Sequence, residues 1–376
     1  MADLRITSPR DGDYLNRHDG RIEGEALLVP VTGTCPQGAV VTVNGNPAVV
    51  TGETFVAEAP VTRQDWTITA SCGCGDAPAH ATAEIAIMAD LNSRPRYRYS
   101  IDDNIEFLHD LGSSPDTYNS LFDHWYLKFW KLMHDKYGTK VHINTYYELS
   151  DHSWNTSMMP DKWRGEWEAN SDWLHLSFHA IQNLPSRIYK DADYDRMAHD
   201  YELVVEQIKR YAGEAVINQE TTVHWAEAPL DACRALKDRG IDILIGLFWV
   251  RNGQCTTKYY LDLEQADYCN TRDAWQDTKE GLTFVTCDSV VNGLQADQVL
   301  PMLETQTGNP HTGEMIELLI HEQYFRQDRL IVEMDGKRNN YFQSDVFEKV
   351  ESGIRWLAER GYEPCFWSDG LLGSPQ

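Results

Sequence analysis

The chain has 376 residues, of which 42% are hydrophobic and 24% charged, as expected for a globular protein of about two domains. Its 58 acidic residues outnumber its 33 basic residues and give a formal net charge of -25. This charge argues against nucleic acid and anionic membranes as partners, because both require a cationic surface. Residues 1–5 lack the apolar core of a signal peptide, so we expect a soluble, cytoplasmic protein of bacterial type unless a signal has been removed.

The first 90 residues contain short runs in which apolar and polar residues alternate, separated by turn signals such as Asn44–Pro47. Strands at this spacing predict a β-sandwich domain over residues 1–90. The pattern resembles the small Ig-like modules attached to many carbohydrate-active enzymes. Residues 91–96 are predicted to be a linker. The predicted strands are Ala39–Val43, Thr54–Ala57, Trp66–Ala70 and Ala83–Ile87.

From residue 97 to residue 376, predicted strands alternate with predicted helices. About eight strands in this alternation indicate parallel βα units and predict a whole or distorted (β/α) barrel. The predicted helices are Asp116–Tyr137, Ala192–Ala212, Leu230–Arg239 and a helix from a cap at Ser344 to Gly361. The predicted strands are Tyr97–Asp103, Lys140–Tyr147, Trp173–His179, Thr221–Trp225, Ile241–Phe248, Leu282–Asp288, Met315–His321 and Pro364–Trp367.

Reactive side chains gather at the ends of these predicted strands, where barrels carry their chemistry. Two adjacent carboxylates can divide the work of holding a cation and accepting a proton from water. Neutral imidazoles suit zinc and similar divalent ions. The pattern therefore predicts a metal or acid–base centre. The strand-end residues are Asp102, Asp103, Tyr146, Tyr147, Glu148, His175, His179, His224, Trp225, His321 and Glu322.

Three short motifs resemble the NodB-like polysaccharide deacetylases over about residues 95–370. Ser100–Asp103 is similar to the T-F-D-D-like strand end of that family, and His179 matches the first histidine of its H-x-x-x-H motif. Leu318–His321 matches its late apolar strand that ends in histidine. The resemblance implies a distorted (β/α) barrel, a divalent metal ion (most often Zn²⁺) and removal of acetyl groups from N- or O-acetylated sugars.

The same resemblance implies roles for single residues. Asp102 corresponds to the general base, His321 to the general acid, and Asp103 and His179 to metal ligands. Asn183 stands where the second histidine of the H-x-x-x-H motif belongs. The segment 221–229 lacks the arginine of the family's R-P-P-Y-like motif, so His224 or His175 could complete the metal site instead.

These observations predict a metal-dependent hydrolase that removes an acyl group from a carbohydrate. The acidic chain disfavours polyanionic glycans, so neutral or amino sugars are the expected substrates. Aromatic and acidic side chains near the strand ends are expected to bind the sugar. These are Tyr146, Tyr147, Glu148, Trp225, Glu227, Asp288 and Trp367.

Two alternatives remain open from the sequence. Carboxylates such as Glu148, Glu227, Asp288 and Glu322 could serve a glycoside hydrolase on the same barrel, and a His or Tyr base could serve a lyase or epimerase acting on a uronic acid. A catalytically decayed carbohydrate-binding protein is the second alternative. Chelation distinguishes the first of these, because a simple glycosidase does not depend on a metal ion.

Overall fold

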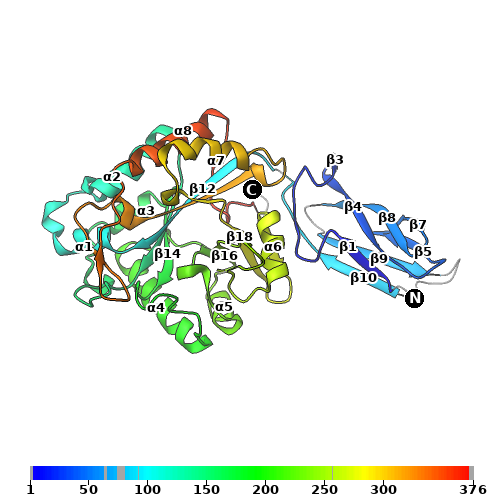
Figure 1. Ribbon diagram of the computed structural model, residues 1–376, viewed down its shortest axis with the longest axis horizontal. Helices are drawn as coiled ribbons and strands as arrows, with labels where there is room; N and C mark the ends of the chain where they lie inside the picture. Colours follow the sequence, from blue (N-terminus) through cyan, green and yellow to red (C-terminus); the bar gives the residue numbers. More distant parts are fainter. Residues whose placement is uncertain (1–2, 63–65, 74–80, 92, 256, 372–376) are drawn as a thin grey trace. The chain divides into compact units, whose positions relative to one another are not determined.

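The computed structural model describes residues 3–62, 66–73, 81–91, 93–255 and 257–371 (Figure 1). Contacts within the chain divide it into two units. The first contains residues 1–94 together with 274–283 and 369–376, and the second contains residues 95–273 and 284–368. Within the described ranges, every helix is too short or too polar to cross a lipid bilayer.

The first unit consists of two antiparallel sheets on a shared apolar core. One sheet has the order β1-β4-β8-β7, with β3 paired to β4, and the other has the order β10-β9-β5-β6. Alternate residues of β4 and β8 are buried, and they meet buried residues of β5 and β9 in one cluster. The bounds are β1 Arg5–Ser8, β3 Arg21–Glu23, β4 Ala26–Thr34, β5 Val40–Val43, β6 Asn46–Pro47, β7 Val49–Thr51, β8 Thr54–Val61, β9 Thr67–Gly73 and β10 Ala81–Ala86.

Shorter pairs complete this unit. β2 (Tyr14–Leu15) runs parallel to β11 (Met88–Ala89), and the N–H of Gln276 in β17 (Ala274–Asp277) donates to the carbonyl of Gly12 at 2.8 Å. The packing of two antiparallel sheets agrees with the predicted sandwich. Its relation to Ig-like modules stays a prediction.

The second unit is built on parallel strands. One sheet has the order β14-β13-β12-β20-β19, with β23 paired to the start of β12, and another contains β15, β16 and β18. The bounds are β12 Arg96–Asn104, β13 Val141–Tyr146, β14 Leu174–Ala180, β15 Glu220–Thr221, β16 Ile243–Gly246, β18 Leu282–Thr286, β19 Ser289–Val290, β20 Met315–His321 and β23 Glu363–Pro364. A hairpin of β21 Ile331–Val332 and β22 Arg338–Asn339 follows β20.

A single buried side chain shows that these strands enclose a common interior. Arg98 of β12 donates from Nε to Glu220 of β15 at 2.6 Å and from Nη1 to Glu317 of β20 at 2.5 Å. Its Nη2 lies 2.5 Å from Nδ1 of His142 in β13. All four side chains are essentially inaccessible to solvent. Because one guanidinium contacts three other strands from both sheets, the two sheets face one interior, as in a distorted barrel.

Helices surround this interior in Figure 1. α4 presents Met197, Tyr201, Val204 and Ile208 as one buried stripe, the spacing expected of a helix packed on a sheet. α2 ends at Gly138, whose φ of 71° is the left-handed conformation that favours glycine. The helices are α1 Glu106–Ser113, α2 Trp125–Tyr137, α3 Arg164–Ala169, α4 Tyr194–Tyr211, α5 Leu230–Lys237, α6 Leu263–Thr271, α7 Val299–Gln306 and α8 Val346–Glu359.

The predicted helix over residues 116–137 is wrong in its first half. Residues 115–123 form two short 3₁₀ turns, and Ser120 and Asp123 make a capping box that serves the second turn. α2 begins only at Trp125, where the His124 ring accepts from a backbone N–H. The predicted strand over residues 221–225 also shortens to β15, and a 3₁₀ turn over residues 224–226 follows it.

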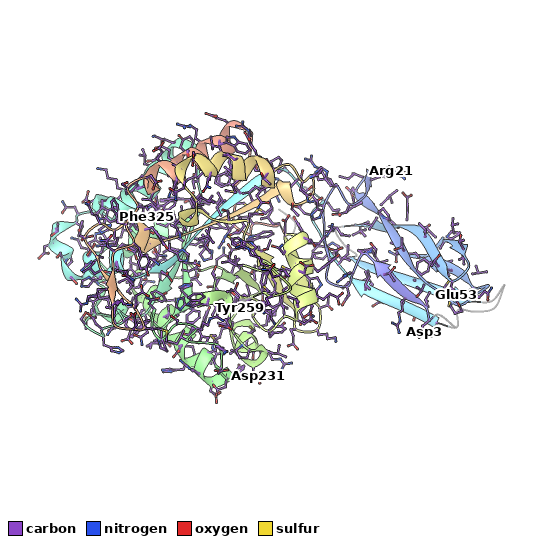
Figure 2. The ribbon with its side chains drawn as sticks, in the orientation of Figure 1. Asp3, Arg21, Glu53, Asp231, Tyr259 and Phe325 are labelled. Carbon is purple, nitrogen blue, oxygen red and sulfur yellow. The ribbon has the colours of Figure 1, made fainter. Side chains whose placement is uncertain are left out.

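Aromatic packing joins the outer helices to the end of β20. Phe325, labelled in Figure 2, lies 5.4 Å from Tyr126 and 5.9 Å from Phe129 of α2, measured between ring centroids. The same ring lies 5.4 Å from Phe347 of α8. This cluster fixes the segment that leaves β20 at the mouth of the barrel.

The buried Arg98 cluster predicts a large loss of stability when the cation is removed. Arg98→Met leaves Glu220 and Glu317 buried without their shared partner, so we expect the free energy of unfolding to fall by about 3–5 kcal/mol. Urea denaturation followed by tryptophan fluorescence measures it. Arg164→Met is the control, since it breaks a half-exposed pair with Glu168 and should cost less than about 1 kcal/mol. Equal losses in the two variants would contradict the role of the cluster.

Glu220 makes this stability depend on pH. Burial raises the pKa of Glu220, but Arg98 and His142 outweigh burial and lower it to about 2 from the ordinary 4.5. The stabilisation is therefore complete above about pH 5 and is lost as the pH falls toward about 2, because the unfolded chain takes up the proton first. We expect the difference in unfolding free energy between wild type and Glu220→Gln to shrink over this range in urea titrations. A constant difference would show that the pKa is not lowered.

Candidate functional site

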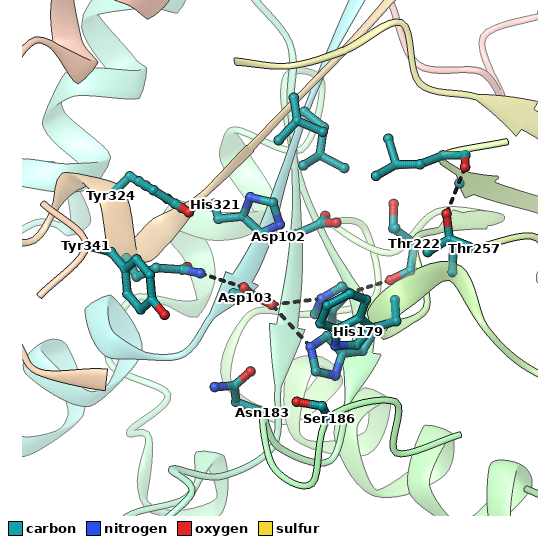
Figure 3. A pocket seen from close by; sticks show the side chains of 18 of the residues that line it. Asp102, Asp103, His179, Asn183, Ser186, Thr222, Thr257, His321, Tyr324 and Tyr341 are labelled. Carbon is teal, nitrogen blue, oxygen red and sulfur yellow. Dashed lines mark hydrogen bonds and ion pairs between the residues drawn. The ribbon is translucent and has the colours of Figure 1, made fainter. Parts of the chain in front are cut away.

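A cavity of about 730 Å³ lies at the carboxyl ends of the barrel strands. Asp102 and Asp103 reach it from the end of β12, His179 from the end of β14, and His321 from the end of β20. His224 reaches it from the turn that follows β15. Figure 3 shows Asp102 beside His321, with His179 and Asn183 on the other side of Asp103.

An irregularity in β12 separates the two carboxylates. The register between β12 and β13 shifts between Ile101 and Asn104, and Asp103 adopts a φ of 62°. Aspartate tolerates this left-handed conformation better than most residues, and such bulges redirect side chains. As a result Asp102 accepts a hydrogen bond from Asn144, whereas Asp103 turns toward a separate group of side chains.

Asp103, His179 and His224 form a possible metal centre. Each offers one ligand atom, and these atoms all lie within 4.8 Å of one another. Oδ1 of Asp103 is 3.2 Å from Nε2 of His179 and 3.8 Å from Nε2 of His224. Nδ1 of His179 lies 2.5 Å from the carbonyl oxygen of Thr222, so Nδ1 carries a proton. Nε2 is then the ring atom that could ligate a cation.

The surroundings of these three residues fit a divalent cation. Burial lowers the pKa of His224 to about 3, so its ring is neutral, the form that binds metals. Its buried Nδ1 has no hydrogen-bond partner among the described residues. Burial alone would raise the pKa of Asp103, but the three neighbouring imidazoles, including His321, lower it well below the usual range. Burial lowers the pKa of His179 as well, but its two carboxylate neighbours outweigh burial and raise it. Two imidazoles and one carboxylate are a ligand set that zinc uses.

Asp102 and His321 face each other across neighbouring strands. They are register partners in the pairing of β12 with β20. Burial raises the pKa of Asp102, which makes this carboxylate a better proton acceptor than an exposed one. Nδ1 of His321 lies 2.9 Å from Oδ1 of Asn292, which leaves Nε2 of His321 for proton exchange. The pair is suited to acid–base chemistry beside the metal centre.

A second cavity, of about 370 Å³, opens on the same centre. Asp103, Asn183 and Gln323 line both cavities. The hydroxyl of Tyr146 donates to Asp103 and lies 3.3 Å from Oδ1 of Asn183. Glu148 lines this second cavity, and its carboxylate is 2.9 Å from His152.

Trp225 is the most exposed large aromatic side chain at the site. It keeps 45% of its surface accessible and lines the first cavity. Its backbone has a φ of 66°, and Ala226 has a φ of 44°, a strained turn directly after His224. Arg187 covers one face of the indole at 5.3 Å and is held by Glu227 at 3.2 Å. Glu227 therefore supports Trp225 and does not itself line the described cavities.

Besides Glu227, four more of the predicted metal-binding and sugar-binding residues lie outside the described lining of the two cavities. His175 lies near the start of β14, at the opposite end of the strand from His179, and stacks on Phe366 at 3.9 Å. Trp367 is buried and donates from Nε1 to Glu317 at 2.9 Å. Neither residue belongs to the described lining of the two cavities.

Asp288 and Tyr147 were also predicted to bind sugar, and the structure places them outside the described lining of both cavities. Asp288 is used inside the fold, where Oδ2 accepts from the backbone N–H of Glu317 at 2.7 Å. Tyr147 is half-buried and is absent from the described lining of both cavities. Glu322, a candidate glycosidase carboxylate, accepts three backbone N–H groups at the start of α1 and is fully buried. It is therefore a helix cap.

Sequence reasoning missed several residues that complete the site. Gln323 donates to Oδ2 of Asp103 at 2.8 Å, two positions after His321. Tyr324 and Tyr341 line the first cavity together with Trp249. Tyr324 lies in the 3₁₀ turn Glu322–Phe325 after β20, whereas Trp249 and Tyr341 come from loops. Alternation along β13 places Asn144 on the same face as His142 and could have indicated it. The loop residues carry no such periodic signal.

Comparison with known proteins gives only distant structural likeness. No family model matches the chain, and no curated protein matches it. A peptidoglycan N-acetylglucosamine deacetylase, solved in complex with 4-naphthalen-1-yl-N-oxidanyl-benzamide, is similar with a TM-score of 0.34 and 13% identity, over 73% of this chain and 88% of that chain. A protein described as a polysaccharide deacetylase, from Mycobacterium smegmatis, has a TM-score of 0.40 and 11% identity, over 73% and 93%. At such TM-scores the function must be argued from the site.

Proposed function

We propose that this protein is a metal-dependent hydrolase that removes an acyl group, such as acetyl, from a carbohydrate. One observation carries the proposal. A carboxylate and two imidazoles converge at one end of a barrel, and a separate buried carboxylate and a histidine lie beside them. This arrangement provides a cation site and an acid–base pair within one cavity.

Asp103, His179 and His224 are the residues that would hold the cation. Bound there, a divalent ion such as Zn²⁺ supplies Lewis-acid chemistry, polarising an acyl carbonyl and making water more acidic. Gln323 and Tyr146 donate hydrogen bonds to the two oxygens of Asp103 and keep its carboxylate oriented, and Asn183 lies beside Tyr146. The carbonyl of Thr222 does the same for His179, since its hydrogen bond fixes which ring nitrogen faces the cation.

Asp102 and His321 carry the protons in this proposal. Asp102 accepts a proton from the attacking water as the new C–O bond forms at the acyl carbon. Nε2 of His321 then donates a proton to the leaving amine or hydroxyl of the sugar as the C–N or C–O bond breaks. The products are a carboxylic acid and the deacylated sugar, so atoms and protons balance.

The walls of the first cavity favour a sugar as the substrate. Trp225, Trp249, Tyr324 and Tyr341 line it, and such rings stack on the apolar faces of pyranoses. We assign Trp225 and Tyr146 to substrate binding, with Glu148 in the second cavity. On this proposal residues 97–376 form the catalytic domain, related to the NodB-like deacetylases, and residues 1–90 form an Ig-like module.

Metal content tests the cation site directly. After reloading with Zn²⁺ and dialysis, we expect about one ion per chain in the wild type and a loss of about tenfold or more in His179→Ala, because two of the three ligands cannot hold the ion. Elemental analysis measures it. His175→Ala is the matched control, a histidine of the same strand outside the site, and should keep the ion. Wild-type protein without metal after reloading would end the proposal.

The turnover rate of an Asp102 variant tests whether this carboxylate is the general base. Asp102→Asn keeps the shape of the side chain but cannot accept the proton, so kcat on acetylated oligosaccharides should fall by about 10²–10⁴-fold while Zn²⁺ content stays unchanged. Acetate release measures turnover. Asp288→Asn, a buried carboxyl away from the cavity, should retain the wild-type kcat. Full turnover by Asp102→Asn at saturating substrate would remove Asp102 from the mechanism.

A further inference from the structure

Asn144 lies on the inward face of β13, directly beneath the acid–base pair, and is fully buried. Its Nδ2 donates to Oδ1 of Asp102 at 2.7 Å and to Oγ of Ser100 at 3.0 Å. Its Oδ1 accepts from Oγ of Ser177 at 2.5 Å and from the backbone N–H of Thr222 at 3.4 Å. Donors on one side and acceptors on the other fix which way the amide points.

The hydrogen bonds to Asp102 all fall on one oxygen. In the described part of the chain Oδ1 receives Asn144 and, more weakly, Ser100 at 3.4 Å, whereas no side chain donates to Oδ2. A carboxylate held by one oxygen cannot rotate freely, and its other oxygen keeps its lone pairs available. Asp102 also lines the cavity that holds the proposed reaction.

We infer that Asn144 is the positioning residue of the base: it anchors Oδ1 of Asp102 and so assigns proton transfer to Oδ2. The inference rests on the proposed function. Asn144 takes no part in bond making. It acts through Asp102, by holding the accepting oxygen in one orientation relative to the bound acyl group.

The rest of the barrel explains why an amide has this position. The buried cation nearest along β12 is Arg98, and it already binds Glu220 and Glu317 one layer below. The segment 221–229, which passes beside the site, contains no arginine that could donate to Asp102. The neutral amide of Asn144 donates instead and orients Asp102 without forming an ion pair with it. The Oδ1 atom of the same Asn144 amide accepts a hydrogen bond from Ser177 of β14. The position of Asp102 therefore depends on two strands, β13 and β14.

A matched pair of alanine variants separates positioning from folding. Asn144→Ala removes the donor to Asp102. Asn104→Ala removes an equally buried amide whose Nδ2 donates to the carbonyls of Ile101 and Asn144, with no bond to Asp102. Asn144→Leu is the second variant if Asn144→Ala fails to fold, because it keeps the approximate volume of the side chain and cannot donate to Asp102. Thermal unfolding verifies that each protein is folded.

We expect kcat for acetate release to fall on the order of 10²-fold in Asn144→Ala, with KM and Zn²⁺ affinity within about threefold of wild type. Zn²⁺ affinity is measured by competition with a chromophoric chelator. Asn104→Ala should lose stability and keep the wild-type kcat.

Four outcomes would overturn the inference. An active wild type with an unimpaired Asn144→Ala overturns it alone. Equal losses of kcat in the two alanine variants, or a parallel loss of Zn²⁺ affinity in Asn144→Ala, show a merely structural role. A wild-type protein that binds Zn²⁺ but releases no acetate from any acetylated sugar tested overturns the proposed function and this inference together.

Discussion

The ion cluster around Arg98 is the constraint on which the second unit depends. Burying a guanidinium inside a barrel costs free energy of folding unless acidic or polar groups surround it. Three strands supply such groups to Arg98, namely Glu220, Glu317 and His142. Once these contacts form, the strands that carry them have a fixed register relative to β12. Every inward side chain above Arg98 is then placed by the two-residue repeat of the strand.

Because of this two-residue repeat, the inward side chains of β12 form successive polar layers between Arg98 and the cavity. Ser100 follows Arg98 on β12 and joins Asn144, Ser177 and Thr221 in a second layer through short hydrogen bonds. Asp102 follows Ser100 and meets His321 in the third layer. The alternation ends at Asp103, where the positive φ turns the next carboxylate toward His179 and His224. The proposed base and metal ligand are therefore adjacent in sequence but separate in function. Amides bond to both of the proposed proton carriers, Asn144 to Asp102 and Asn292 to His321.

The sequence was most informative where a strand ended. Five polar residues stand at or near the ends of predicted strands, and parallel strands bring their carboxyl ends to one edge, so their convergence could be predicted. These are Asp102, Asp103, His179, His224 and His321. His175 shared a face with His179, but the strand's length places it at the other end of the barrel. Trp367 and Asp288 satisfy partners inside the fold, a use that composition does not reveal. Gln323 and Tyr341 enter from irregular segments without periodicity. Local capping by Ser120 and Asp123 overrode the helical pattern before α2.

The proposed function requires that Asp103, His179 and His224 bind one divalent cation. Anomalous diffraction at the zinc absorption edge, from crystals of the full chain grown with Zn²⁺, tests this most directly. We expect one strong peak within about 2.0–2.2 Å of a carboxylate oxygen of Asp103 and of one nitrogen of each histidine. Zinc bound only elsewhere, with these three side chains still hydrogen-bonded to one another, would contradict it.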